Sequence, residues 1–99
     1  MKIVWSPLSL EHVKELAQYI ALDKVGVAEK WVDDLFSLVE GLADNPEKGR
    51  VVPETNQPLI RELIFRKNFR VVYKLENQKI QILIVKRFSQ LLKESEIES

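Results

Sequence analysis

Cysteine is absent from this chain of 99 residues, and histidine occurs once, as His12. Without thiols there is no disulfide framework and no thiolate chemistry. A lone histidine that lacks carboxylates at ligand spacing on both sides gives no zinc motif. The three glycines (Gly26, Gly41 and Gly49) are too far apart for a phosphate-binding loop, and no G-x-S-x-G motif is present. The sequence therefore predicts neither a metal site nor a bound cofactor.

Long hydrophobic runs are also missing. No apolar stretch approaches the roughly 20 residues that cross a bilayer. The N-terminal MKIVWSPLSLEH lacks the apolar segment of a secretory signal, and the absence of cysteine fits a reducing compartment. We therefore expect a soluble cytoplasmic protein that makes no contact with a membrane and forms a single domain over residues 1–99.

The net charge is zero, but the charges are segregated along the chain. Residues 1–47 contain nine acidic and four basic side chains, whereas residues 48–93 contain eleven basic and three acidic ones. The last six residues add three acids. A basic half of this kind can bind a polyanion or an acidic partner, but it can equally be the solvated side of a sheet. Composition alone leaves both interpretations open.

The hydrophobic pattern predicts an α+β domain with the element order β-α-α-β-β-β. A short strand over 2–5 precedes Ser6-Pro7, which is typical of a helix N-cap and first turn. Apolar residues at helical spacing then predict amphipathic helices over 7–22 and 27–43. We expect the two helices to be antiparallel and to pack on one face of a mostly antiparallel four-stranded sheet.

The remaining strands follow a long loop over 45–58 that is rich in proline. Alternating apolar residues predict strands over 59–65, 69–75 and 79–85, joined by hairpin-length links. The tail RFSQLLKESEIES is compatible with a short helix. The predicted core contains the apolar residues expected to face one another between helices and sheet: Ile3, Trp5, Val13, Leu16, Ile20, Trp31, Leu35, Leu38, Leu42, Leu63, Phe65, Val71, Tyr73, Ile82 and Ile84.

Alternation along the strand over 69–75 separates two kinds of side chain. Val71 and Tyr73 are expected to face the helices, whereas Arg70 and Lys74 are expected on the other face, which the helices leave open. This places cations on an exposed basic surface, where truncating Arg70 would open no cavity. A salt bridge from Arg70 to Glu62 or Glu54 is the alternative interpretation.

With this element order, the sequence resembles the RelE/ParE superfamily of toxins from type II toxin–antitoxin systems, which includes plasmid stabilisation proteins. The matching stretches are the tryptophan that ends the first strand, AEKWVDDLFSLVEGLADNPEKGRVVPE, RELIF…FRVVYKL and IQILIVKRFSQLL. The resemblance covers nearly the whole chain and rests on the order and spacing of these stretches.

The resemblance implies one of two mechanisms. RelE-like members cleave mRNA in the ribosomal A site, with basic residues on the sheet and a His or Tyr near the C-terminus, whereas ParE-like members inhibit DNA gyrase. Arg70 matches the arginine that RelE-like toxins use to hold phosphate, and Arg87 and Arg61 match further basic positions. After the last strand this sequence has FSQLLKESEIES, without His or Tyr.

The missing His or Tyr favours a ParE-like gyrase inhibitor over the two alternatives, a RelE-like endoribonuclease and a non-toxic nucleic-acid-binding member. Whether the protein is an enzyme therefore stays open. The resemblance also implies a cognate antitoxin, and it is compatible with a homodimer. The residues expected to contact the antitoxin or target are the cations and the C-terminal leucines: Arg50, Arg61, Arg66, Arg70, Lys74, Arg87, Leu91 and Leu92.

Overall fold

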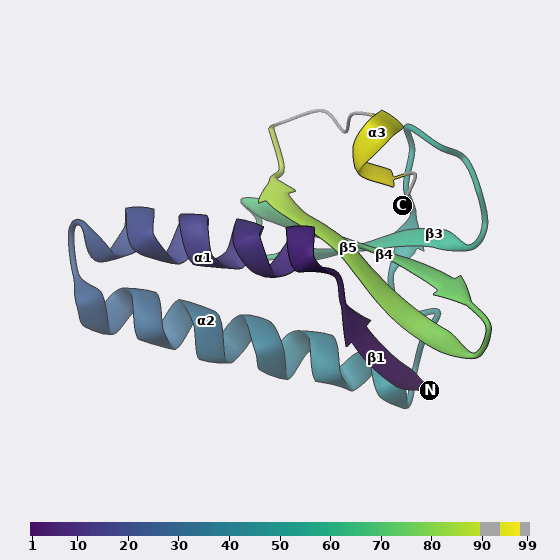
Figure 1. Ribbon diagram of the computed structural model, residues 1–99, viewed down its shortest axis with the longest axis horizontal. Helices are drawn as coiled ribbons and strands as arrows, with labels where there is room; N and C mark the ends of the chain where they lie inside the picture. The colour runs from purple at the N-terminus through teal and green to yellow at the C-terminus, as the bar shows by residue number, and fades with distance from the viewer. Residues whose placement is uncertain (90–93, 98–99) are drawn as a thin grey trace.

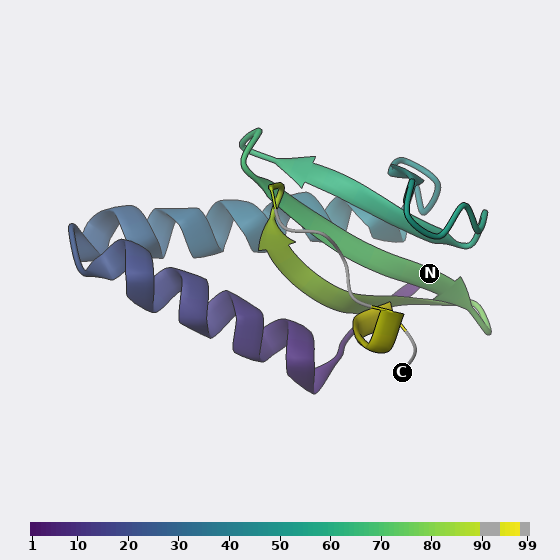
Figure 2. The same cartoon turned by 90° about the horizontal axis from the view of Figure 1, so that it is seen from above.

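The computed structural model describes residues 1–89 and 94–97. After β1 (Lys2–Trp5), two long helices, α1 (Pro7–Ala21) and α2 (Val25–Glu40), form an antiparallel hairpin (Figure 1). The closed end of this hairpin extends beyond the sheet (Figures 1 and 2). None of the helices in the described part of the chain is long and apolar enough to cross a bilayer.

The described residues form one sheet in the strand order β1-β5-β4-β3-β2. β1 runs parallel to β5, and every other neighbouring pair is antiparallel. A single 3₁₀ turn, η1, follows α2, and a four-residue helix, α3, lies near the C-terminus. The bounds of these later elements are η1 (Gly41–Ala43), β2 (Arg50–Val51), β3 (Ile60–Phe65), β4 (Phe69–Glu76), β5 (Lys79–Arg87) and α3 (Glu94–Ile97).

The predicted α+β fold, with two antiparallel helices on one face of a mostly antiparallel sheet, is confirmed. The sheet has one strand more than expected. β2 lies inside the segment predicted to be a loop, where Arg50 pairs with Glu62 and Val51 with Arg61. Two residues are too few to show an alternating pattern, so this strand leaves no trace in the sequence.

The main core lies between the helix hairpin and the sheet. Trp31, Leu35 and Val39 of α2 pack there against Val71 and Tyr73 of β4. With the exception of Ile84, every predicted core residue belongs to this cluster or packs against it. The 3.6-residue period of the helices and the two-residue period of the strands therefore identified the face that each element buries.

Ile84 lies on the other face of the sheet, so its predicted place under the helices is wrong. In the β4–β5 ladder Val72 pairs with Ile84 but Tyr73 pairs with Ile82, which leaves Leu83 as an extra residue. This β-bulge reverses the alternation along β5. Ile84 and Leu83 consequently join a second buried cluster on the far face, together with Val52, Ile60 and Val72.

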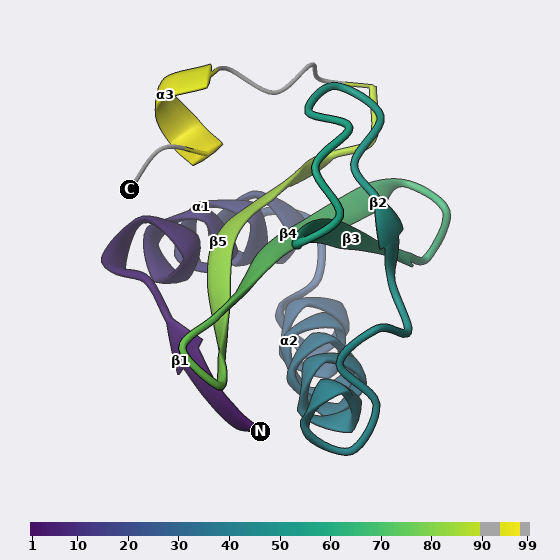
Figure 3. The ribbon, with the colours of Figure 1, turned by 90° about the vertical axis from the view of Figure 1, so that its right-hand side faces the viewer.

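The far face of the sheet is therefore partly covered rather than open. Ile97 of α3 packs against the second cluster. Figure 3 shows α3 on the side of the sheet away from α2. Lys86 of β5 forms an ion pair with Glu96 of α3, with Nζ 2.7 Å from Oε1. The acidic C-terminal segment thus neutralises one cation of the sheet within the same chain.

Tyr73 fixes the loop between η1 and β2. Its hydroxyl donates to the carbonyl of Pro46 at 2.8 Å and accepts the N–H of Gly49 at 2.9 Å. A Cβ on Gly49 would lie 2.6 Å from both the Tyr73 hydroxyl and the carbonyl oxygen of Glu62. Only glycine lets the backbone approach the ring this closely. The start of β2 is thereby set beside β3.

Candidate functional site

Arg70 lies at the centre of a buried network of ion pairs on the far face of the sheet. Its side chain is 5% exposed, and Nε and Nη2 lie 2.7 and 2.5 Å from Oε1 of Glu62. Nη1 and Nη2 donate to the two oxygens of Glu54 at 2.8 and 2.9 Å. Hydrogen bonding to Glu54, supported by Glu62 and opposed by burial, raises the pKa of the Arg70 guanidinium.

Arg50 completes this network from the other side of Glu62. Its Nε and Nη2 lie 2.8 and 2.7 Å from Oε2 of Glu62, so this fully buried carboxylate accepts from two arginines. The guanidinium carbons of Arg50 and Arg70 lie 5.7 and 5.9 Å from the centre of the half-exposed Phe88 ring. Two guanidinium groups and the carboxylates of Glu62 and Glu54 give the network a formal charge of zero.

The structure corrects the expected environment of Arg70. The residue does lie on the face away from the long helices, but it is buried instead of exposed, and all three guanidinium nitrogens donate to carboxylates. The alternative, a salt bridge from Arg70 to Glu62 or Glu54, is confirmed, and both carboxylates take part. A phosphate would have to displace one of these carboxylates to reach the guanidinium.

The other predicted cations do not share one surface. Arg61 occupies the position on β3 opposite Tyr73 and donates to the carbonyl oxygens of Pro58 and Gly49 at 3.0 and 2.9 Å. Arg66, in the turn after β3, pairs with Asp34 of α2. These interactions place Arg61 and Arg66 on the side of the sheet that faces the helices.

Arg87 and Lys74 also lie apart from each other. The Arg87 guanidinium lies 4.8 Å from the centre of the Tyr19 ring of α1, again on the helix side. Lys74 lies on the far face and is 3.5 Å from a carboxylate oxygen of Glu76. Of the six cations predicted to contact the antitoxin or target, Arg50, Arg70 and Lys74 lie on the far face, and the other three lie on the helix side. The predicted contact residues Leu91 and Leu92 lie outside the described residues.

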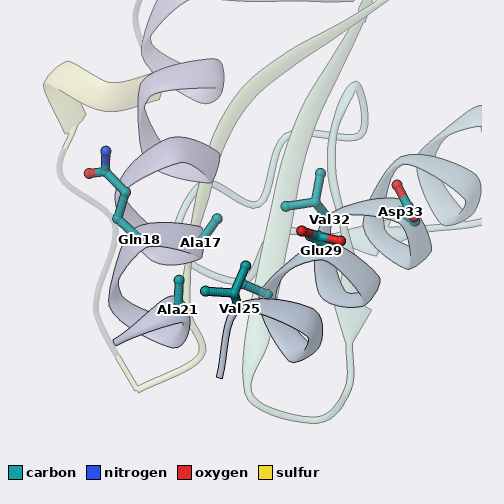
Figure 4. Close-up of a pocket in the computed structure, with 8 residues that line it drawn as sticks. Ala17, Gln18, Ala21, Val25, Glu29, Val32 and Asp33 are labelled. Atoms are coloured by element: carbon teal, nitrogen blue, oxygen red, sulfur yellow. The ribbon is translucent and has the colours of Figure 1, made fainter. Parts of the chain in front are cut away.

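An apolar groove that the sequence analysis missed lies between α1 and α2, at the end of the hairpin that extends beyond the sheet. Its volume is about 470 Å³. Figure 4 shows Ala17 and Ala21 of α1 facing Val25 and Val32 of α2 across it. Small side chains on the facing sides of two helices leave this space open. The four-residue spacing of Ala17 and Ala21, and Ala28 on α2, are the sequence signals that could have predicted it.

The rim of the groove is acidic, and its surroundings are apolar. Glu29 and Asp33 of α2 line it together with Gln18. At the tip of the hairpin, Leu22 is 84% exposed and Val27 is 48% exposed. An exposed apolar patch with a charged rim is typical of a protein-interaction surface.

Comparison with known proteins assigns the chain to a family. The family model described as the ParE toxin of the type II toxin–antitoxin system parDE matches residues 3–92. The chain belongs to the ParE toxin family. The expected membership of the RelE/ParE superfamily is thus confirmed. No match was found among curated proteins.

A solved structure, described as a chromosomal ParDE TA system from P. aeruginosa, shares the ParE-like fold with a TM-score of 0.73. It is 24% identical to this chain in sequence, and the alignment covers 88% of this chain and 95% of that one. At this level of identity the likeness is one of fold. The match extends over most of both chains, so the helix hairpin and the sheet are shared features.

Proposed function

We propose that this ParE-family protein is a toxin that inhibits DNA gyrase and is neutralised by a cognate antitoxin. The family match over residues 3–92 carries the proposal. The Arg70 network supports the choice of target. In a ribonuclease, the arginine that holds phosphate must be accessible, whereas each nitrogen of the Arg70 guanidinium is already hydrogen-bonded to Glu62 or Glu54.

Among the described residues, the one carboxylate that lines the pocket beside Arg70 is that of Glu54, and it is held in the ion pair with Arg70. The pocket next to it, about 410 Å³ in volume, is lined by Arg50, Pro53, Glu54 and Phe88. Within the described part of the chain, neither histidine nor tyrosine lines this pocket. Cleavage by 2′-hydroxyl attack needs a group that can accept or donate a proton. These features favour a gyrase inhibitor over a RelE-like endoribonuclease.

Controlled expression in bacteria, followed by two readouts, tests the choice of target. The proposal predicts fragmented chromosomes with intact mRNA, and it predicts that the purified protein inhibits DNA supercoiling by gyrase. Cleaved mRNA in translating extracts would instead support the endoribonuclease. Binding to nucleic acid that weakens steeply with salt, without toxicity, would support the non-toxic binding module.

The α1–α2 groove is the surface that we assign to the antitoxin. An amphipathic helix can insert an aliphatic side chain between Ala17, Ala21 and Val32, which is a common mode of peptide recognition. The acidic rim formed by Glu29 and Asp33 favours lysine or arginine beside that aliphatic anchor. This surface lies away from the Arg70 network, so antitoxin docking and the paired cations belong to different parts of the molecule.

Two substitutions test this docking surface, with the cognate antitoxin as the probe. Ala21→Phe fills the groove, and Glu29→Lys reverses the charge of its rim. Each should leave toxicity intact and weaken antitoxin binding by about tenfold or more, because like charges or steric overlap at an interface cost several kcal/mol. Glu40→Lys, about three turns further along α2, is the matched control and should bind normally. Normal neutralisation of both groove variants would exclude this surface.

A further inference from the structure

Beyond the end of β1, residues at the start of α1 take the place of a neighbouring strand and hydrogen-bond the backbone of β5. β1 pairs with β5 only as far as Trp5, which lies opposite Ile82. Beyond that point the N–H of Ser6 donates to the carbonyl of Ile82 at 3.0 Å, and the Ser6 hydroxyl donates to the carbonyl of Leu83 at 3.0 Å. The same hydroxyl caps α1 by accepting the N–H of Ser9 at 3.0 Å. Ser6 therefore joins the start of the helix to the sheet.

His12 provides the next contact along this edge. The N–H of Val85 donates to Nδ1 of His12 at 3.2 Å. Because Nδ1 accepts this hydrogen bond, the neutral ring carries its proton on Nε2. The Val85 side chain is buried in the main core, so the contact ties the middle of α1 to a well-packed part of β5. Unlike the serine contacts, this one depends on a group that titrates near neutral pH.

Charged groups surround the His12 ring on three elements. Partial burial lowers the pKa of His12 below its usual 6.5; Glu96 of α3 raises it, Lys86 of β5 lowers it, and Glu15 and Glu11 of α1 raise it. Arg87 of β5, which stacks on Tyr19, lines the same cleft. Loss of hydration is the largest of these influences, so the neutral ring is the form that the folded protein favours.

Protonation turns Nδ1 from an acceptor into a donor. Two N–H groups then face each other across the His12–Val85 contact, and the hydrogen bond is lost. We propose that His12 is a proton-sensitive latch: the neutral ring holds α1 on the edge of β5, and the imidazolium releases that edge. The released ring turns to the carboxylates beside it, Glu11 and Glu15 on its own helix and Glu96 on α3. The freed strand edge then presents unpaired backbone groups.

Hydrogen exchange measured by NMR across a pH titration of the whole protein tests the latch. Between about pH 8 and about pH 5, the range in which histidine titrates, the protection of the Val85 amide should fall. The expected fall is about tenfold for each pKa unit that separates the latched from the released imidazole. The Val71 amide, in the centre of β4, is the internal control and should keep its protection.

His12→Asn is the matched variant, because its Oδ1 can occupy the position of Nδ1 and accept the same hydrogen bond without titrating. In this variant the protection of the Val85 amide should not depend on pH. Three results would overturn the latch: equal pH dependence in the parent and the variant, a parallel loss of protection at Val71, or an unchanged Val85 amide while the His12 ring gains its proton. The comparison of Val85 with Val71 in the parent decides the question even if the variant does not fold.

Discussion

Glu62 and Arg70 form a buried ion pair between adjacent strands, with Nε of Arg70 2.7 Å from Oε1 of Glu62. Burying a carboxylate removes its hydration, and this free-energy cost is no longer offset when its cationic partner is removed. Arg70→Ala removes the Arg70 guanidinium from both Glu62 and Glu54, while Glu62 keeps its contact with Arg50. We expect the free energy of unfolding to fall by about 3–5 kcal/mol, as measured by denaturant titration. Toxicity should fall with stability.

Two further variants separate this effect from a general loss of charge. Lys74→Ala removes a cation from the same face, but its partner Glu76 is solvated, so the expected loss is at most about 1 kcal/mol. Combining Arg70→Ala with Glu62→Gln should recover part of the lost stability, because it neutralises one of the two carboxylates that Arg50, the remaining arginine of the network, would otherwise face. An Arg70→Ala protein as stable as the Lys74→Ala protein would show that the network does not support the fold.

Replacement by alanine should destabilise the protein at Gly49 and stabilise it at Gly26. The Cβ of Gly49→Ala would overlap the Tyr73 hydroxyl and the Glu62 carbonyl, each 2.6 Å away, and we expect a loss of about 1–3 kcal/mol. Gly26 lies in α2 with no atom within 4 Å of the added Cβ. Gly26→Ala should stabilise the protein by about 0.4–1 kcal/mol, because alanine restricts the unfolded chain. Melting temperatures measured side by side test both signs.

Tyr73 should make the protein sensitive to alkaline pH. Burial raises the pKa of its phenol above the usual 10.0, against the opposing effects of the Gly49 N–H and Arg61. As the pH rises past 10.0, the unfolded chain loses this proton before the folded one does, and stability falls. The contribution of the Tyr73 phenol to stability is fully present below pH 10.0. Tyr73→Phe should be less stable than the parent at neutral pH, and the difference should shrink as the pH rises.

The exposed Tyr19 is the control for this experiment. Tyr19→Phe removes a hydroxyl from a residue that is 62% exposed, so its stability at neutral pH should match that of the parent. Unfolding is followed by circular dichroism at a series of alkaline pH values. A constant difference between the parent and Tyr73→Phe at every pH would contradict the assignment.

Leu35 and Leu22 compare a buried leucine with an exposed one on the same hairpin. Leu35 has no exposed surface, and its side chain packs in the main core. Leu35→Ala should therefore cost about 2–5 kcal/mol through the cavity it leaves. Leu22 is 84% exposed, and its truncation should change stability by less than about 0.5 kcal/mol. Comparable losses in the two variants would contradict the assignment of the core.

The helices and the main core could be predicted because their patterns are local. The apolar side chains of Leu35 and Val39 recur at the period of a helix, and Ser6-Pro7 marks where α1 begins. The position of Ile84 could not be predicted in this way. It depends on the extra residue Leu83, and a bulge becomes visible only when the two strands are paired.

The candidate site was harder to predict, because the function of a charge depends on its partner. Alternation correctly placed Arg70 on the face away from the long helices. It could not show that Glu54, from a loop, and Glu62, from the next strand, both converge on that guanidinium. The α1–α2 groove was missed for a related reason. The groove exists because the small side chains of Ala17 and Ala21 leave space between the helices. Such a space depends on how the two helices pack, and the sequence does not give that packing directly.

The parallel pairing of β1 with β5 links the beginning of the chain to its last strand. Lys2 lies opposite Lys79, and Trp5 lies opposite Ile82. During synthesis, β1 emerges from the ribosome long before β5 has been made, so the two strands can pair only after β5 has been translated. Contacts between such distant segments close late and slow the folding of a domain. The complete sheet can therefore form only after β5 has been translated, and a partner has until then to meet the chain before it is fully folded.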